Sequence, residues 1–278
     1  MTPVIIICKQ GLKPNAPILT THTAKQSLHH NNPTYLISDF PVNIENKLFK
    51  QFNLNDFINN DFIKLQKNYI HLNQLPEDIV FMWISKYFIL KKFMENLNLK
   101  KIFLIDYDVL LYTEIKKIET FYSQYDFTLS KNSAGSNSFF SYNMIKDFTE
   151  KVFILYEEKE NNHWFNHLKQ TYKDMLNQGL EGGICDMALL NFYKNCNTTN
   201  NKFIGGEMTQ IINNKTFDHH IKYDDSEYKK INFIKNIKYV NKIPYCFNLK
   251  LKKYIQFLSL HFQGASKDFL HQHITYNL

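Results

Sequence analysis

The amino-acid sequence predicts an α/β fold, with a mixed but mostly parallel sheet flanked by helices. Three short and mostly apolar runs, residues 4–8, 34–39 and 102–105, have the composition of buried strands. Between them, residues 16–29 form a candidate helix with polar flanks and an interruption near residues 20–22, and residues 78–97 carry apolar side chains at helical spacing. This alternation of strands and helices is typical of the nucleotide-binding half of a doubly wound protein.

Local signals set the boundaries of these elements. The first strand ends at Lys9-Gln10-Gly11, and the second begins after Pro33. Residues 49–63 mix apolar side chains with asparagines, which predicts a loop with a short helix. The helix at 78–97 begins shortly after Pro76 and has carboxylates in its first turn, where the helix dipole favours them.

The second half of the chain has a less regular pattern. It predicts short strands at 127–130 and 139–142, and helices at 145–156 and 187–193. A glycine-containing loop, residues 181–186, leads into the second of these helices, and a strand from Ile255 runs into a turn at Gly264. Because no internal repeat or domain linker is visible, we expect a single domain over residues 1–278.

The composition is that of a globular protein, with 278 residues, 44% of them hydrophobic and 21% charged. A net charge of +7 favours anionic partners such as phosphates, nucleotides or an acidic membrane surface. No dense block of basic residues is evident, so we expect this charge to be spread over the surface. Nucleic acid is therefore not an expected partner.

The four cysteines are Cys8, Cys185, Cys196 and Cys246, and they lack the Cys-x-x-Cys spacing of zinc and redox motifs. This predicts reduced thiols in a cytosolic protein. No uncharged apolar run is long enough to span a bilayer, and the N-terminal run is too short for a signal peptide. We expect a soluble, cytoplasmic protein that is at most peripheral at the inner face of the cell membrane.

Two carboxylates, Asp106 and Asp108, directly follow the predicted buried strand at 102–105. Burying an ionised carboxylate costs several kcal/mol unless a positive group pairs with it. Oxygen ligands suit Mg²⁺ or Mn²⁺, and the carboxyl ends of strands are where α/β proteins bind ligands. The pair therefore predicts a divalent metal site. The alternative is a strand that ends at a turn, with one aspartate capping the next element.

Three motifs occur in order along the chain: Asp106-Tyr107-Asp108, the loop from Gly182 to Asp186, and the closing Leu260-His261-Phe262-Gln263-Gly264-x-x-Lys267. Together they resemble nucleotide-sugar glycosyltransferases of the GT-A fold, in particular bacterial surface-polysaccharide enzymes that end in His-Phe-Gln-Gly-x-x-Lys. The resemblance spans roughly residues 4–267. One departure is Lys86-Tyr87, where Arg-Trp is expected; Lys86 stays a candidate for the donor phosphates, although lysine lacks the bidentate grip of arginine.

The resemblance implies a ligand set for a metal and a diphosphate. Asp108 would bind Mn²⁺ or Mg²⁺ directly, and Asp106 would bind the metal or the ribose. His261 would be a third ligand, which favours Mn²⁺. Lys267 would neutralise a phosphate near backbone N–H groups exposed at Gly264. The alternatives are a core histidine at 261 and a solvated surface amine at 267.

The acceptor hydroxyl needs a group that takes its proton, and Asp186 is our candidate for this general base. The alternatives for Asp186 are a helix N-cap and, as in related retaining transferases, a contact to the donor sugar. The sequence leaves inverting and retaining chemistry open. Glu181 and Asp218 are reserve candidates for the base. Adjacent side chains in a strand point to opposite faces, so His219 and His220 are not expected to bind one metal ion. We expect both to lie at the surface.

The nucleotide base is expected against the ends of the first two strands, at Cys8, Lys9 and Asp39. Residues 135–137, which include Gly135, could contact the hydroxyls of the donor sugar, although a plain turn explains this loop equally well.

The predicted function is metal-dependent transfer of a hexose from a nucleotide diphosphate sugar to an oligosaccharide or lipid-linked glycan. UDP-galactose, UDP-galactofuranose and UDP-glucose are the expected donors, and lipopolysaccharide, capsule or another bacterial surface polysaccharide is the expected product. Residues 1–115 would bind the nucleotide and residues 116–278 the acceptor. A metal-dependent nucleotidyltransferase or phosphodiesterase remains an alternative, as does a non-enzymatic basic binding protein.

Overall fold

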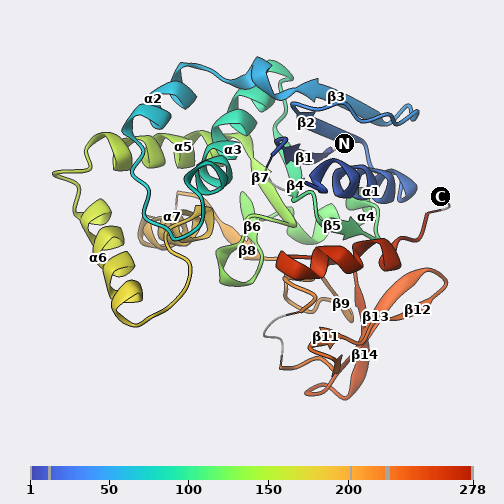
Figure 1. Cartoon of the computed structure of the whole chain (residues 1–278). Helices are drawn as coiled ribbons and strands as arrows, with labels where there is room; N and C mark the ends of the chain where they lie inside the picture. The colour runs from blue at the N-terminus through green and yellow to red at the C-terminus, as the bar shows by residue number, and fades with distance from the viewer. Residues whose placement is uncertain (1, 12–13, 201, 223–225, 277–278) are drawn as a thin grey trace.

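A seven-stranded sheet lies at the centre of the computed structural model, which describes residues 2–11, 14–200, 202–222 and 226–276, without the side chains of residues 132 and 197–200 (Figure 1). Across the sheet the strands are β3 (Phe49–Asn53), β2 (Thr34–Ser38), β1 (Val4–Cys8), β4 (Lys101–Ile105), β7 (Ser138–Ser141), β6 (Phe127–Leu129) and β8 (Gly205–Glu207). Neighbouring strands are parallel, except that β7 runs antiparallel to both β4 and β6. The predicted α/β fold with a mixed, mostly parallel sheet is confirmed.

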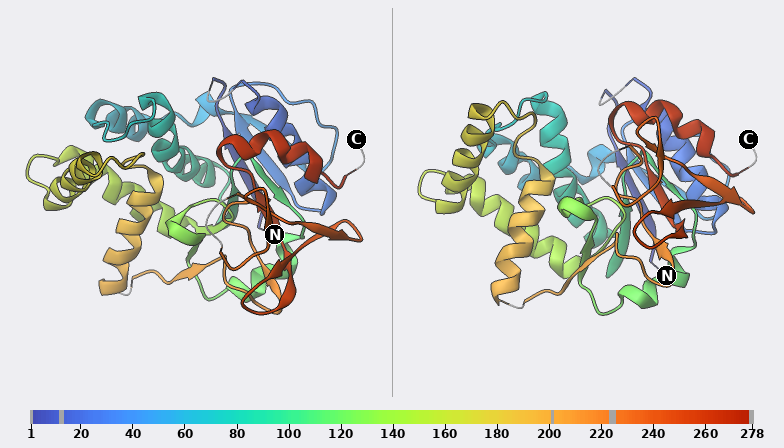
Figure 2. Two further views of the ribbon diagram at one scale, coloured as in Figure 1. Left: turned by 60° about the horizontal axis from the view of Figure 1, so that its bottom comes forward. Right: turned by 90° about the horizontal axis from the view of Figure 1, so that it is seen from below.

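Helices cover both faces of this sheet, as the two views in Figure 2 show. The core of one face receives side chains from α2 (Asn60–Asn68), α3 (Glu77–Asn96), α5 (Tyr142–Glu157), α6 (His163–Asn177) and α7 (Asp186–Asn200). The other face is covered by α1 (Ala16–His29), with the single turn α4 (Ile115–Ile118) nearby. Short 3₁₀ segments are η1 (Leu54–Phe57), η2 (Glu119–Tyr122), η3 (Lys131–Ser133) and the longer η4 (Gly264–His273).

The β1 strand shows why its sequence is apolar without alternation. Ile5 and Ile7 belong to the core beneath α3, whereas Val4 and Ile6 point to the opposite core, which also contains Ala24 of α1. Successive side chains of a strand alternate between faces, so a strand that is covered on both sides must be apolar throughout. Burial on both faces fixes β1 and its neighbour β4 at the centre of the sheet.

Residues 215–222 and 226–257 form a small lobe beside the main sheet, drawn in orange in Figure 1. Its four-stranded sheet has the order β12 (Lys238–Val240), β13 (Ile243–Asn248), β14 (Lys253–Phe257) and β9 (Lys215–Thr216). A two-stranded sheet pairs β10 (Lys230–Ile231) with β11 (Ile234–Lys235). A second one pairs β5 (Val109–Leu111) with β15 (Ser259–His261), and thereby ties the end of the chain to the strand after Asp108.

Two elements differ from the sequence-based expectation. Residues 49–63 contain the expected short helix, as η1 and the start of α2, but Phe49–Asn53 forms the edge strand β3 beside β2 in place of a loop. This strand is only half-buried and contains Lys50, Gln51 and Asn53, so it lacks the apolar pattern that marks β1. The helix α6 was not predicted either, since only Phe165 and Leu168 of it are buried.

Part of the positive charge, which we expected to be spread over the surface, gathers in the small lobe. Seven half-buried or exposed lysines lie within residues 229–254 of the small lobe, at positions 229, 230, 238, 242, 250, 252 and 253. Over the ranges that the structure describes, no helix is long and apolar enough to cross a membrane. All four cysteines are free thiols, and Cys8, Cys185 and Cys246 are buried.

Candidate active site

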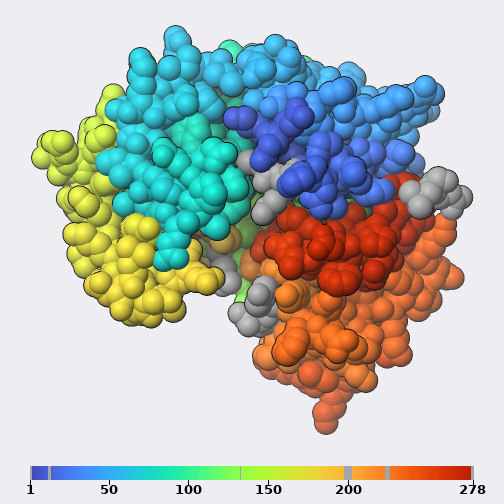
Figure 3. Space-filling model, viewed as in Figure 1, coloured from blue at the N-terminus to red at the C-terminus, as the bar shows by residue number. Residues whose placement is uncertain are grey.

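A pocket of about 360 Å³ opens at the carboxyl ends of β1 and β4. The surface is hollowed there between residues of α3, drawn in cyan, and of η4, drawn in red (Figure 3). The charged side chains that line it are Lys86, Asp106, Asp108, Asp186, His261 and Lys267. Carboxyl ends of parallel strands are where open α/β sheets bind ligands.

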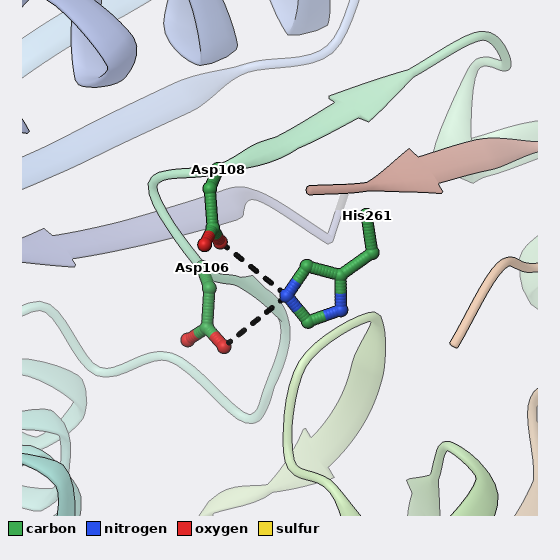
Figure 4. Close-up of side chains that lie close together, drawn as sticks. All are labelled: Asp106, Asp108 and His261. Carbon is green, nitrogen blue, oxygen red and sulfur yellow. Dashed lines mark ion pairs between the residues drawn. The ribbon is translucent and has the colours of Figure 1, made fainter. Parts of the chain in front are cut away.

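Three of these side chains converge in the pocket, as Figure 4 shows. Asp106 follows β4 directly, and Asp108 precedes β5. The β15 strand runs antiparallel to β5 and places His261 opposite Val109. The backbone N–H of Phe262 donates to the carbonyl oxygen of Asp108 at 3.0 Å, which extends this pairing by one bond. The pairing of β15 with β5 therefore places the imidazole of His261 beside two carboxylates that are distant from it in sequence.

The three groups have the spacing of metal ligands. Nε2 of His261 lies 3.3 Å from Oδ1 of Asp108 and 4.0 Å from Oδ2 of Asp106. One ligand atom of each side chain lies within 4.8 Å of the other two. Asp108 and His261 are buried, whereas about a third of the Asp106 side chain is exposed (34%). The open side of the cluster therefore faces the pocket through Asp106.

The site fits a divalent cation on the chemistry of its donors. Oδ1 of Asp108 is buried and makes no hydrogen bond within the described part of the chain, although His261 lies close to it. Nδ1 of His261 lies 3.3 Å from the side-chain amide nitrogen of Gln263 and 3.4 Å from the hydroxyl oxygen of Ser136. When Nδ1–H donates to that hydroxyl, the Nε2 lone pair faces the carboxylates. Two carboxylates and an imidazole suit Mn²⁺ or Mg²⁺.

Electrostatics in the pocket keep Asp108 ionised. Burial raises its pKa, but the adjacent His261 and Lys267 outweigh burial and hold the pKa below the usual range of an aspartate. For His261, burial lowers the pKa, whereas Asp108 and Asp106 raise it above the ordinary value. A cation that binds between these groups therefore meets an Asp108 carboxylate that is already charged.

Lys267 contacts the same aspartate from the other side. Its Nζ lies 2.8 Å from Oδ2 of Asp108 and donates to the hydroxyl of Tyr107 at 2.6 Å. The ammonium also lies 4.2 Å from the centre of the Tyr107 ring. Sequence reasoning missed Tyr107, although it stands between the two aspartates. Gly264, which lines the pocket and opens η4, has a φ of 59°, a region that favours glycine.

Lys86 links two carboxylates across the pocket. Its Nζ lies 2.9 Å from Oδ2 of Asp186 and 3.4 Å from Oδ1 of Asp106. Burial alone would lower the pKa of Lys86, but Asp106 and Asp186 hold it well above the usual value. Lys86, which stands where the resemblance leads us to expect arginine, is therefore charged and forms ion pairs with both aspartates.

Asp186 is the first residue of α7 and is buried. The hydroxyl of Tyr87 donates to its Oδ2 at 3.5 Å, and burial raises the pKa of that tyrosine. Gly135 lies directly over the same hydroxyl, since a Cβ at this position would come within 2.0 Å of it. The loop that contains Gly135 and Ser136 can line the pocket only because no side chain projects from residue 135.

Asp218 and His220 are not at the surface, which corrects the expectation for His219-His220. Asp218 is fully buried and His220 is 5% exposed, whereas His219 is half-buried. Nζ of Lys235, also buried, lies 2.6 Å from Oδ1 of Asp218. The backbone N–H of His261 donates to Oδ2 of Asp218 at 3.0 Å. Sequence reasoning missed the support of His261 by Asp218 and Lys235, because Lys235 lies outside the motifs that mark the site.

The remaining candidates lie outside the lining of the pocket. Cys8 is fully buried, and burial raises the pKa of its thiol to about 12. Lys9 is exposed, and Asp39 accepts a hydrogen bond from the backbone N–H of Gln10 at 2.6 Å. Glu181, a reserve candidate for the base, is exposed and is not part of the lining.

No protein-family model matches the sequence, and no match was found among curated proteins. Solved structures of three glycosyltransferases are similar in fold. Apo mouse xyloside xylosyltransferase 1 is 9% identical at a TM-score of 0.43, covering 77% of this chain and 87% of its own. The galactosyltransferase LgtC, in complex with donor and acceptor sugar analogues, is 8% identical at 0.39, covering 78% and 76%.

The glycosyltransferase GlyE of Streptococcus pneumoniae TIGR4 is 14% identical at a TM-score of 0.36, covering 74% of this chain and 45% of its own. At these scores and identities, the likenesses identify neither the reaction nor the substrates of this chain.

Proposed function

We propose that this chain is a metal-dependent glycosyltransferase of the GT-A fold that moves a hexose from a nucleoside diphosphate sugar to a glycan. One observation carries the proposal. The cluster of Asp106, Asp108 and His261 surrounds a buried carboxylate oxygen without a hydrogen-bond partner among the described residues, at the ligand-binding end of a mostly parallel sheet. Such a cluster can hold a divalent ion against the diphosphate of a donor.

Each charged group of the pocket has a task in this reaction. Asp106, Asp108 and His261 would hold Mn²⁺ or Mg²⁺, which as a Lewis acid stabilises the charge that develops on the leaving diphosphate. Lys267 supplies a second positive charge close by, because its ammonium lies 2.8 Å from Asp108. Backbone N–H groups near Gly264 would add hydrogen bonds to the same phosphates. Lys86 would add a further positive charge near a donor oxygen while it stays paired with Asp186.

The nucleotide base would lie over the carboxyl ends of β1 and β2, between Lys9 and Asp39, with Cys8 packed beneath. UDP is the nucleotide that we propose, with galactose, galactofuranose or glucose as the sugar. Residues 1–115 would supply most of this donor site. Residues 116–278 would supply the acceptor site.

Asp186 is the proposed general base for the acceptor hydroxyl. It lines the pocket, and it is held by Lys86 and Tyr87 on a carboxylate oxygen. Those two partners would orient the Asp186 side chain, so that its carboxylate is preorganised to accept the proton of the acceptor hydroxyl. The same placement would also suit a contact to the donor sugar, and the stereochemistry of the product decides between the two roles.

The proposed acceptor is an oligosaccharide or a lipid-linked glycan of a bacterial surface polysaccharide, such as lipopolysaccharide or capsule. Synthesis would take place in the cytoplasm, with peripheral contact to the inner face of the cell membrane.

The direct test is donor turnover. The purified protein is incubated with Mn²⁺ and each UDP-hexose in turn, and release of UDP is measured with and without EDTA. We expect UDP release from one donor, its loss with EDTA, and its loss in Asp108→Asn but not in Glu160→Gln, a matched neutralisation of an exposed carboxylate. Release of nucleoside monophosphate instead would favour a phosphodiesterase. Nucleotide binding that changes neither with EDTA nor in Asp108→Asn would favour a basic binding protein.

A further inference from the structure

The positive charge of the protein is concentrated in one segment. Residues 228–267 contain nine lysines and neither aspartate nor glutamate. Since the whole chain carries a net charge of +7, the remaining residues together carry −2. Lys235 and Lys267 of this segment are used internally, in ion pairs with Asp218 and Asp108. The other seven lysines lie at the surface of the small lobe, which projects at the lower right in Figure 3.

The sheet of this lobe has one buried and one open face. In the antiparallel register, Tyr245 lies opposite Lys238, and Phe247 opposite Tyr254, so these side chains share a face. The alternate residues of β13 and β14 are buried and pack with residues of β15 and η4. The open face carries Val240, Ile243, Tyr245, Phe247 and Tyr254, which are half-buried or exposed.

Apolar side chains also occupy the turns at the edge of the lobe. Phe233, in the turn between β10 and β11, is 80% exposed. It has a φ of 66°, a conformation that is strained for a bulky residue and that asparagine or glycine adopts more easily. Ile231 beside it is also exposed. The loop between β13 and β14 adds Leu249 and Leu251, which alternate with Lys250 and Lys252 and are all exposed.

We infer that one part of this lobe, residues 229–254, is a docking surface for an anionic lipid bilayer. The lysines would contact acidic headgroups, and the apolar turn residues, Phe233 foremost, would enter the boundary of the acyl chains. Interfacial binding combines these two terms, apolar burial and attraction to anionic lipids. This inference deepens the peripheral membrane contact of the proposed function, and it does not depend on the transferase reaction.

The side chains of the lobe favour lipid over nucleic acid. Aliphatic residues such as Ile231, Val240, Leu249 and Leu251 cannot stack on bases, whereas they can enter a bilayer interface. The chain contains no arginine, so it lacks the planar side chain that binds phosphate and guanine in a bidentate manner. Within residues 228–267 there is no carboxylate, and the exposed Glu227 that borders them lies 3.8 Å from Lys250, so little like-charge repulsion opposes the approach of an acidic surface.

The test is sedimentation of the full chain with vesicles. We compare vesicles of equal parts phosphatidylglycerol and phosphatidylcholine with vesicles of phosphatidylcholine alone, at low and at raised salt. We expect binding to the anionic vesicles only. Each lysine near such a surface contributes about fivefold, so the triple variant Lys250→Gln, Lys252→Gln, Lys253→Gln should bind about a hundredfold more weakly. The matched control removes three exposed lysines elsewhere, Lys64, Lys67 and Lys169, and should bind nearly as the parent does.

The apolar contribution has its own variant. Phe233→Asn should fold normally, since asparagine tolerates the φ of 66°, and should weaken vesicle binding about tenfold. Leu176→Gln, a change of an exposed apolar residue on α6, is the control. Equal losses in the two triple variants, or equal binding to both kinds of vesicle, would overturn the inference, as would binding to single-stranded DNA in preference to lipid. Metal-dependent binding of UDP by the same samples shows separately whether the transferase site is intact.

Discussion

The backbone N–H of His261 donates to the carboxylate of Asp218 at 3.0 Å, and both residues are buried. The second oxygen of that carboxylate is held by Lys235 at 2.6 Å, and the backbone oxygen of Asp218 accepts a hydrogen bond from Asn137 at 3.0 Å. One buried ion pair thus joins the strand of His261 to the loop beside Ser136. It positions the imidazole without touching the ligand pocket.

This ion pair predicts that removing only the lysine destabilises the protein more than removing both charges. Lys235→Met leaves a buried carboxylate without its cation, and should lower the free energy of unfolding by about 3–5 kcal/mol. The double variant with Asp218→Asn removes the charge as well and should recover much of that loss. Urea unfolding followed by circular dichroism measures both. If the double variant is no more stable than Lys235→Met, the ion pair is not the source of the effect.

Asp186→Asn tests the proposed base. An amide cannot accept the acceptor proton, so kcat should fall by about 10²–10⁴ while the affinity for UDP with Mn²⁺ stays within about threefold. Steady-state kinetics and calorimetry of the same preparation separate the two quantities. Loss of UDP affinity with little further change in kcat would instead assign Asp186 to donor binding.

Tyr107→Phe removes the hydroxyl that accepts from Lys267 but keeps the ring beneath the ammonium. Lys267 then loses one of the groups that orient it, and the affinity for UDP with Mn²⁺ should fall about threefold to tenfold. Tyr172→Phe, on α6, is the control with an equal chemical change. Calorimetric titration decides the outcome, and an unchanged affinity would show that Asp108 and the ring suffice to place Lys267.

Gly135→Ala places a methyl group within 2.0 Å of the Tyr87 hydroxyl. Tyr87 must move away from Asp186, which should lower the free energy of unfolding by about 1–3 kcal/mol and reduce kcat. Tyr87→Phe removes the clashing atom, so the double variant Gly135→Ala, Tyr87→Phe should be more stable than Gly135→Ala alone. Chemical unfolding of the three variants tests this order, and a double variant that is the least stable would refute it.

The sequence predicts the centre of the fold well, because β1, β4 and α3 have strong local patterns. The interruption expected near residues 20–22 is wrong, since α1 runs unbroken from Ala16 to His29. The sequence predicts β3 and α6 poorly, since β3 is a polar edge strand and α6 buries only Phe165 and Leu168. Local patterns do not report such elements, because their stability comes from neighbours that are distant in sequence.

The residues of the site also differ in how well the sequence predicts them. Asp106 and Asp108 are visible at the end of a buried strand, whereas His261 is found only through the closing motif, since β5–β15 pairing brings it into place. The support of His261 by Asp218 and Lys235 leaves no pattern in the sequence. A buried ion pair forms from two ordinary residues that only the tertiary structure brings together.

Calorimetric titration of UDP tests the metal site at Asp106, Asp108 and His261 most directly. It is carried out with Mn²⁺, with EDTA, and with Mn²⁺ on Asp108→Asn, a variant that keeps the shape of the side chain and removes its charge. We expect binding with Mn²⁺ and its loss in both other titrations, with folding unchanged. Binding of equal strength in all three would contradict a metal site at these residues, and with it the proposed mechanism.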